Sequence, residues 1–178
     1  TRIQKFDSGG TFTASYAISE NAWGLAVDTN GNMYVTGVSI VYKYSSSGTI
    51  LITMNNATPW FVGINVRGIS VDPITNNFAI VNQSGSPFLK IYNSSGTRLL
   101  ATDATTTTSS GGSIGVGVAA CGIFYYNNIL FITQEYGAVV YKASVSELLL
   151  TSSLASSTFI VPSLKTTSDP SFAITTRP

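Results

Sequence analysis

A block of residues recurs along this chain with the same internal order of parts, and such a repeat constrains the architecture more than any other feature does. The clearest copy spans 23–51, and a second spans 67–100. The longest step between copies contains an inserted polar run, 103–113, so the underlying period is nearly constant. Four residues mark the same place in successive copies, at steps of 44, 54 and 49 residues: Gly24, Gly68, Gly122 and Ser171.

Each copy holds four short apolar runs separated by turn residues, which is the pattern of short antiparallel strands. Asn and Gly, which tolerate positive φ, stand between the first and second runs, at Asn30-Gly31, Asn76-Asn77 and Asn127-Asn128. No window shows a sustained apolar period of 3.6 residues, so no substantial helix is expected. The pattern predicts an all-β fold, a β-propeller built of four-stranded antiparallel blades.

The repeat divides the whole chain into blades and parts of blades. The first strands are expected at 25–27, 69–71, 123–125 and 172–174. The predicted units are the end of a blade at 1–20, a blade at 21–60, a blade at 61–113 with its polar insertion at 103–113, a blade at 114–163, and the first strand of a further blade at 164–178. Both terminal blades are then partial, so we expect these residues to be part of a larger propeller. The remainder of a longer chain, or copies of this one, would complete it, and the isolated chain is not expected to be a well-folded monomer.

Two stretches resemble a known family. Arg2-Ile-Gln-Lys-Phe-Asp-Ser8 and Gly24-Leu-Ala-Val-Asp28, the latter followed by Gly31-Asn-Met-Tyr-Val35, are similar to the strand and turn pattern of the NHL-repeat propellers. The resemblance covers most of the chain and is closest up to Leu100. It implies the propeller fold but leaves function open, because such propellers include enzymes, sensors and binding platforms.

Charge is sparse, and this restricts the kinds of partner. Charged residues make up 10% of the 178 residues, and the net charge is +1. The few Lys and Arg residues are scattered, so nucleic acid is not an expected partner. Ser, Thr, Asn and Gly supply the polar surface instead, which suits an extracellular or cell-surface protein. No membrane-spanning stretch is recognised.

The chain has no histidine, which excludes Ser-His-Asp and Cys-His nucleophile systems and histidine-ligated metals within these residues. Asp28 and Asp72 occupy equivalent places at the end of a first strand, where we expect each carboxylate to accept hydrogen bonds from the N–H groups of the following turn. Cys121 is expected to be a small buried residue. We expect neither a bound metal nor a cofactor.

Candidate ligand-binding residues lie in loops between second and third strands and in connections between blades, which share one face of such a propeller. The candidates are, in chain order, Trp60, Asn82, Gln83, Gln134, Glu135 and Tyr136. Trp23 precedes a first strand and Trp60 lies in a connection between blades, where an exposed tryptophan would be a plausible anchor for a sugar or a protein. The Asn-x-Ser/Thr pattern marks possible glycosylation sites at Asn56, Asn82 and Asn93.

Two functions stay open on the sequence. The first is a non-catalytic extracellular interaction or scaffold module, which acts in adhesion or assembly through a propeller face. The alternative is a fragment of a carboxylate-dependent, metal-binding propeller enzyme of lactonase type, since lactonase-like propellers hold a divalent cation with carboxylates and Asn in the central channel. That alternative needs three of five side chains in one coordination sphere: Asp28, Asp72, Asn82, Asp103 and Glu135.

The strand register also yields an expectation for the core. Val27 and Val71 alternate with the small residues Ala26 and Ser70 on their strands. Both valines are therefore expected to face a core between blades.

Overall fold

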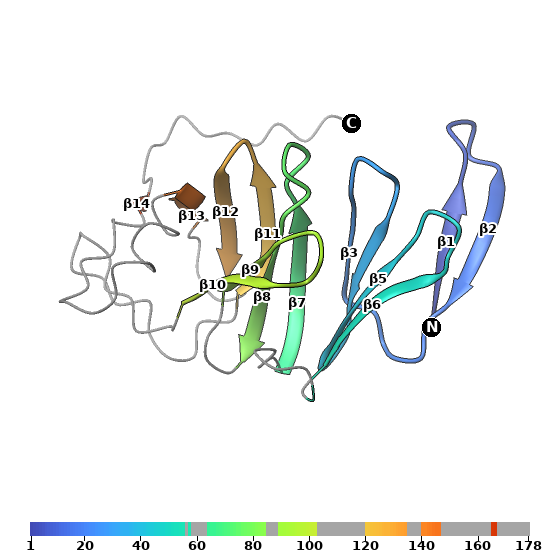
Figure 1. The fold of residues 1–178 in the computed structure, drawn as a ribbon, viewed down its shortest axis with the longest axis horizontal. Coiled ribbons are helices and arrows are strands. Elements are labelled where there is room, and N and C mark those ends of the chain that lie inside the picture. The colour runs from blue at the N-terminus through green and yellow to red at the C-terminus, as the bar shows by residue number, and fades with distance from the viewer. Residues whose placement is uncertain are drawn as a thin grey trace.

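A computed structural model describes residues 1–55, 57, 64–84, 89–102, 120–134, 140–146 and 165–166 of the chain. These residues form four antiparallel sheets, one of two strands and three of four (Figure 1). Helical structure among them is limited to Val145 and Ser146, as the missing 3.6-residue period predicts. In this part of the chain no helix has the length and apolar character needed to cross a membrane.

Strands that follow one another in the sequence are neighbours in each sheet. The first sheet holds β1 (Arg2–Phe6) and β2 (Phe12–Ala17). The second holds β3 (Gly24–Val27), β4 (Met33–Thr36), β5 (Ile40–Tyr44) and β6 (Ile50–Asn55). The third holds β7 (Ile64–Val71), β8 (Phe78–Ser84), β9 (Leu89–Tyr92) and β10 (Arg98–Thr102). The fourth holds β11 (Ala120–Tyr126), β12 (Ile129–Gln134), β13 (Val140–Ser144) and β14 (Lys165–Thr166).

The first strand of each four-stranded sheet lies where the repeat predicts it. The expected strands 25–27, 69–71 and 123–125 fall within β3, β7 and β11, which we call the inner strands. The fourth expected strand, 172–174, lies outside the described residues.

The fourth sheet extends past the boundary expected at residue 163. Its outer strand β14 falls in the stretch assigned to a further blade, and it pairs with β13 through Thr166 opposite Tyr141 and Lys165 opposite Lys142.

Residues with positive φ close the hairpins at the predicted Asn and Gly positions. Between first and second strands they are Gly31 (φ 78°), Asn76 (56°), Asn127 (48°) and Asn128 (64°). Most other residues with a Cβ are strained in this conformation, so turn chemistry fixes where each hairpin reverses. The hairpins that join β1 to β2, β5 to β6 and β9 to β10 use glycine in the same way, at Gly10, Gly48 and Gly96.

Glycine on each of two inner strands allows the next sheet to approach closely. A Cβ atom added to Gly24 would lie 2.9 Å from the carbonyl oxygen of Arg67, which is on β7. A Cβ atom added to Gly68 would lie 3.0 Å from the carbonyl oxygen of Cys121, which is on β11. A Cβ atom this close to a backbone oxygen would require one of the two strands to shift. The same contact therefore joins two successive pairs of inner strands.

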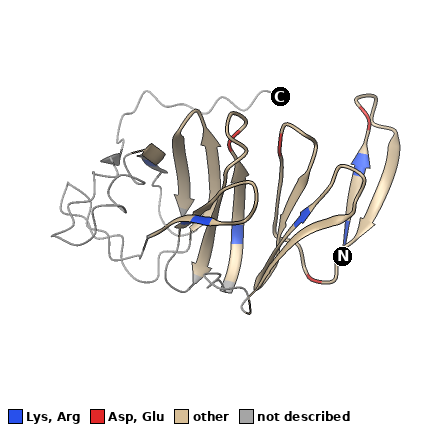
Figure 2. Cartoon of the chain, viewed as in Figure 1, with Lys and Arg blue, Asp and Glu red and all other residues tan. Residues whose placement is uncertain are grey.

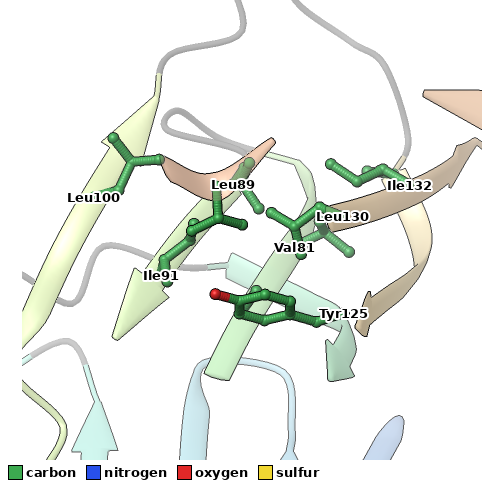
Figure 3. Packing of buried hydrophobic residues seen from close by; sticks show 10 residues of the cluster. Val81, Leu89, Ile91, Leu100, Tyr125, Leu130 and Ile132 are labelled. Atoms are coloured by element: carbon green, nitrogen blue, oxygen red, sulfur yellow. The ribbon is translucent and has the colours of Figure 1, made fainter. Parts of the chain in front are cut away.

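Two apolar clusters fill the spaces between the four-stranded sheets. Between the second and third sheets, the ring centroid of Phe78 lies 5.0 Å from the ring centroid of Tyr34 and 5.1 Å from that of Tyr92. Burial raises the pKa of Tyr92 to about 12. Between the third and fourth sheets (Figure 3), the cluster contains Val81, Leu89, Ile91, Leu100, Tyr125, Leu130 and Ile132.

The two-stranded sheet covers the second sheet only in part. Leu25 and Val27 on β3 are 53% and 56% exposed, whereas Ile69 and Val71, at the same repeat positions on β7, are 7% and 9% exposed. The expectation of a core position is therefore right for Val71 and wrong for Val27. The reason is that Val71 packs in the cluster against the second sheet, while among the described residues the sheet of β1 and β2 has no inner strand that could pack against Val27.

We expect Val71→Ala to lower the free energy of unfolding by roughly 1–3 kcal/mol, because two methyl groups leave a packed core. Val27→Ala serves as the matched control, because the same methyl groups leave an exposed surface, and it should change stability by less than about 0.5 kcal/mol. Urea unfolding of the two variants and the parent chain, at protein concentrations low enough to prevent association of the chain, measures both values. Equal losses for the two variants would mean that Val27 is covered in solution.

Candidate ligand-binding face

The sheets present two opposite edges with different chemistry (Figure 2). At the first, the turns that follow β1, β3 and β7 carry Asp7, Asp28 and Asp72, and we call it the turn edge. At the second, the C-terminal parts of β4, β8 and β12 pair with the inner strands at Gly24, Gly68 and Gly122, and we call it the glycine edge.

The carboxylate of Asp28 is used by its own hairpin. Its Oδ1 accepts the backbone N–H groups of Asn30 and Asn32, both at 2.9 Å. Its Oδ2 accepts the Nδ2 of Asn32 at 2.9 Å and the hydroxyl of Tyr34 at 3.3 Å, and the Nζ of Lys43 lies 4.0 Å away. Burial disfavours the charged carboxylate, but these hydrogen bonds and Lys43 outweigh it and hold the pKa of Asp28 below its ordinary value. Burial and the nearby Asp28 charge raise the pKa of Tyr34.

Asp72 and Asp7 have the same role in their turns. Asp72 accepts the Thr75 hydroxyl at 2.6 Å and the N–H of Ile74 at 3.3 Å. The Oδ1 of Asp7 accepts the N–H groups of Gly9 and Thr11 at 2.9 and 2.8 Å. The expectation that Asp28 and Asp72 accept turn hydrogen bonds is confirmed. Nowhere in the described part of the chain do three His, Cys, Asp or Glu residues come together as metal ligands would.

An arginine is held in a fixed orientation at the glycine edge. The guanidinium of Arg67 lies over the indole of Trp23, with Cζ 3.2 Å from the ring centroid. Its Nε donates a hydrogen bond to the Oε1 of Gln83 at 2.7 Å. An aromatic face and an amide oxygen thus restrain the planar cation from two directions. We call these three residues the arginine cluster.

The close approach of the inner strands brings the cluster together. Trp23 directly precedes Gly24 and Arg67 directly precedes Gly68, so the two side chains stand at equivalent positions of neighbouring copies. Cys121 holds the same position before Gly122. It is half-buried rather than fully buried as expected, with its Sγ 3.9 Å from the hydroxyl oxygen of Thr133.

The positive charge of Arg67 is not neutralised by a neighbouring acid. Among the residues described, the one pair of opposite charges within 4.0 Å is Lys43 with Asp28, at the turn edge. Arg67 is itself half-buried, where water screens its charge less than at an exposed site. Among the described residues the cluster therefore presents a cation with no carboxylate within 4.0 Å, although Glu20 lies at the same face, beside Gly37.

An open hollow of about 440 Å³ lies near the loop between β4 and β5. This loop is one of those predicted to form the ligand-binding face, and it is joined to β7 because the N–H of Asn65 donates to the carbonyl oxygen of Val38 at 2.5 Å. The hollow is mostly polar, and its lining residues are Thr1, Ser19, Glu20, Asn21, Val38 and Ser39.

The predicted ligand-binding residues have different outcomes. Gln83 belongs to the arginine cluster. Asn82 is 1% exposed because it lies on the central strand β8, so in the folded chain its side chain is accessible neither to a ligand nor to glycosylation. Asn93 uses its Oδ1 to accept the N–H groups of Ser95 and Thr97 in its turn. For Gln134 the structure describes the backbone, at the end of β12. The other predicted positions lie outside the described residues: Asn56, Trp60, Glu135 and Tyr136.

Sequence reasoning did not single out Arg67. The signal that could have found it is the position directly before the repeated glycine, where a tryptophan, an arginine and a cysteine follow one another in successive copies. Variation at one fixed place of a regular repeat is typical of a site where the scaffold is shared and the chemistry is not.

No family model and no curated protein sequence matches the chain. Solved structures do match. Virginiamycin B lyase from Staphylococcus aureus is similar with a TM-score of 0.58 at 14% identity, over 79% of this chain and 44% of the lyase. A protein of the mitotic checkpoint complex is similar with a TM-score of 0.55 at 15% identity, over 77% of this chain and 42% of that protein. A gluconolactonase from Xanthomonas campestris is similar with a TM-score of 0.50 at 16% identity, over 75% of this chain and 41% of the lactonase.

These similar structures are propellers. The fold is a β-propeller. Each four-stranded sheet is a blade, and the inner strands are the first strands of their blades. The chain spans less than half the length of each of the three proteins, and at such low identity the similarity shows the fold alone.

We expect Asp28→Asn to lower the free energy of unfolding at neutral pH by about 1–2 kcal/mol, because hydrogen bonds to a charged acceptor are weakened. The folded-state pKa of Asp28 lies below its unfolded value of 3.8, so its contribution is complete above about pH 4 and is lost as the pH falls through the folded-state pKa. Unfolding free energies of parent and variant, measured from pH 7 to pH 2, should therefore converge at low pH. A constant difference across that range would contradict the assignment.

Proposed function

We propose that this propeller is a non-catalytic, extracellular interaction module of NHL-repeat type that binds a protein partner at the glycine edge. The observation that carries the proposal is the arginine cluster, in which Arg67 is restrained by Trp23 and Gln83 and lacks a neighbouring acid. Trp and Arg are the residues most enriched among those that dominate binding energy in protein interfaces. The uncharged polar composition supports the extracellular location.

The acids support binding over catalysis. Asp28 and Asp72 already accept hydrogen bonds within separate hairpins at the turn edge, away from the arginine cluster. A lactonase-type centre would need carboxylates that converge and keep oxygens available for a cation. Asp103 and Glu135, which that alternative also requires, lie outside the described residues. The similar gluconolactonase does not favour the alternative, because the likeness is one of fold.

The stacking at Trp23 favours a protein over a glycan as the partner. Trp23 as a residue is 37% exposed, and the guanidinium of Arg67 covers one face of its indole. A sugar ring that stacks on tryptophan needs a broad free face. The remaining surface, an aromatic edge beside a cation, suits the mixed apolar and polar contacts of a protein interface.

The proposal is tested by photo-crosslinking from each edge of the propeller. A photoreactive amino acid replaces Ser39, which lines the hollow, or Ser47, in the turn between β5 and β6, and mass spectrometry identifies proteins captured from the native extracellular medium. We expect a partner that is captured from position 39 and not from 47. The purified partner should then bind the parent chain in calorimetry and lose at least ~2 kcal/mol of binding free energy with Trp23→Ala. Equal capture from both positions, or no effect of Trp23→Ala, would contradict the proposal.

We also propose that strands beyond the described ones cover the exposed apolar face of β3. The contrast between Leu25 and Val27, which are exposed, and their buried counterparts Ile69 and Val71 supports this. The remainder of a longer chain or another copy would supply the strands, by adding to the two-stranded sheet of β1 and β2. The isolated 18.8 kDa chain should therefore self-associate or aggregate in light scattering. A monodisperse monomer would contradict this.

A further inference from the structure

We propose that Arg67 binds the carboxylate of an acidic side chain, so that the ligand at the glycine edge is an acidic peptide segment of the partner protein. The inference rests on the proposed function for the existence of a protein partner. It adds the chemical group that the partner must present.

The guanidinium of Arg67 has hydrogen-bond donors left for a carboxylate. Arginine carries five N–H donors, and in Arg67 the Nε–H is donated to Gln83. None of the residues that the structure describes accepts a hydrogen bond from the two Nη groups. The paired Nη donors of one guanidinium match the two oxygens of a carboxylate in a bidentate contact. Gln83 and Trp23 fix the orientation of this pair before any ligand arrives.

The electrostatics favour an anion at the same place. An arginine side chain carries a positive charge at physiological pH. It is half-buried, and among the described residues no carboxylate lies within 4.0 Å of it. A half-buried charge without a counterion is costly, and an incoming carboxylate removes that cost.

The number of cations favours a carboxylate over a phosphate. Phosphate groups are typically recognised by clusters of arginine or lysine. Trp23 and Cys121, which hold the positions equivalent to Arg67 on the neighbouring inner strands, are uncharged. Lys43 donates to the carbonyl oxygen of Ser94 and lies beside Asp28 at the turn edge. A single restrained arginine suits a singly charged planar anion.

The test uses the full chain, labelled with ¹⁵N, and the Nε–Hε NMR signal of Arg67. The probes are the capped tripeptides Gly-Glu-Gly and Gly-Gln-Gly, which differ only in the charge of the central side chain. We expect the glutamate peptide to shift the Arg67 signal in a saturable manner and the glutamine peptide to leave it unchanged. Equal shifts with both peptides, or none with either, would overturn the carboxylate site.

Two substitutions test whether binding needs the paired, oriented N–H donors of Arg67 or only its positive charge. Arg67→Lys keeps the charge but loses the paired donors, and Gln83→Ala frees the Nε and loosens the orientation. Each should weaken binding of the glutamate peptide by roughly tenfold, followed through the indole N–H signal of Trp23. Arg98→Lys, the same exchange on the outer strand β10, is the control and should bind like the parent. Parent-like binding by both Arg67→Lys and Gln83→Ala would overturn the inference.

A third probe and the crosslinking experiment separate this inference from its alternatives. Methyl glucuronide offers the same carboxylate on a sugar, and tighter binding of it than of the glutamate peptide would overturn the choice of a peptide ligand. A partner captured from position 39 without any response to the glutamate peptide would leave the proposed function standing and refute the carboxylate site. A response to the glutamate peptide without a captured partner would leave the carboxylate site standing and refute the proposed function.

Discussion

The close approach of neighbouring inner strands is the constraint on which the rest of this structure depends. A Cβ atom added to Gly24 or Gly68 would collide with a backbone carbonyl oxygen of the next inner strand. The same added Cβ atoms would lie 3.3 Å from the Cγ2 methyl group of Ile69, for Gly24, and 3.2 Å from that of Ile123, for Gly68. One residue type thus determines how closely the blades stack and which side chains enter the core between them.

Because of this stacking, the side chains at the two edges of the propeller interact in different ways. At the turn edge, the carboxylates of Asp28 and Asp72 accept hydrogen bonds from their own hairpins and so stabilise local structure. At the glycine edge, side chains from neighbouring blades meet, so the contact of Trp23 with Arg67 depends on the blade spacing. Polar groups that are satisfied within one hairpin stabilise the fold, whereas a restrained cation without an acid beside it is available to a ligand.

Much of the fold could be predicted from the sequence, because strands and turns here depend on local chemistry. The Asn and Gly residues at the hairpins adopt the positive φ values they were expected to adopt, and the inner strands lie where the repeat places them. The prediction that Val27 is buried was wrong because its burial depends on a neighbouring inner strand rather than on its own alternation with Ala26. Arg67 was missed for a related reason: its partner Trp23 is 44 residues earlier in the chain, and only the stacking of two blades brings them together.

Gly68→Ala, compared with Gly9→Ala, tests the central claim most directly through the free energy of unfolding. The added methyl group at residue 68 meets the Cγ2 of Val81 at 2.9 Å and the carbonyl oxygen of Cys121 at 3.0 Å, and neither strand can move without disturbing the core, so we predict a loss of about 1–3 kcal/mol. At residue 9 the nearest atom is the Asp7 carboxylate at 3.3 Å, on an exposed hairpin that can adjust, and the loss should stay below about 1 kcal/mol. Equal stability of Gly68→Ala and the parent chain would contradict the account, because the blades would then be spaced by something other than these glycines.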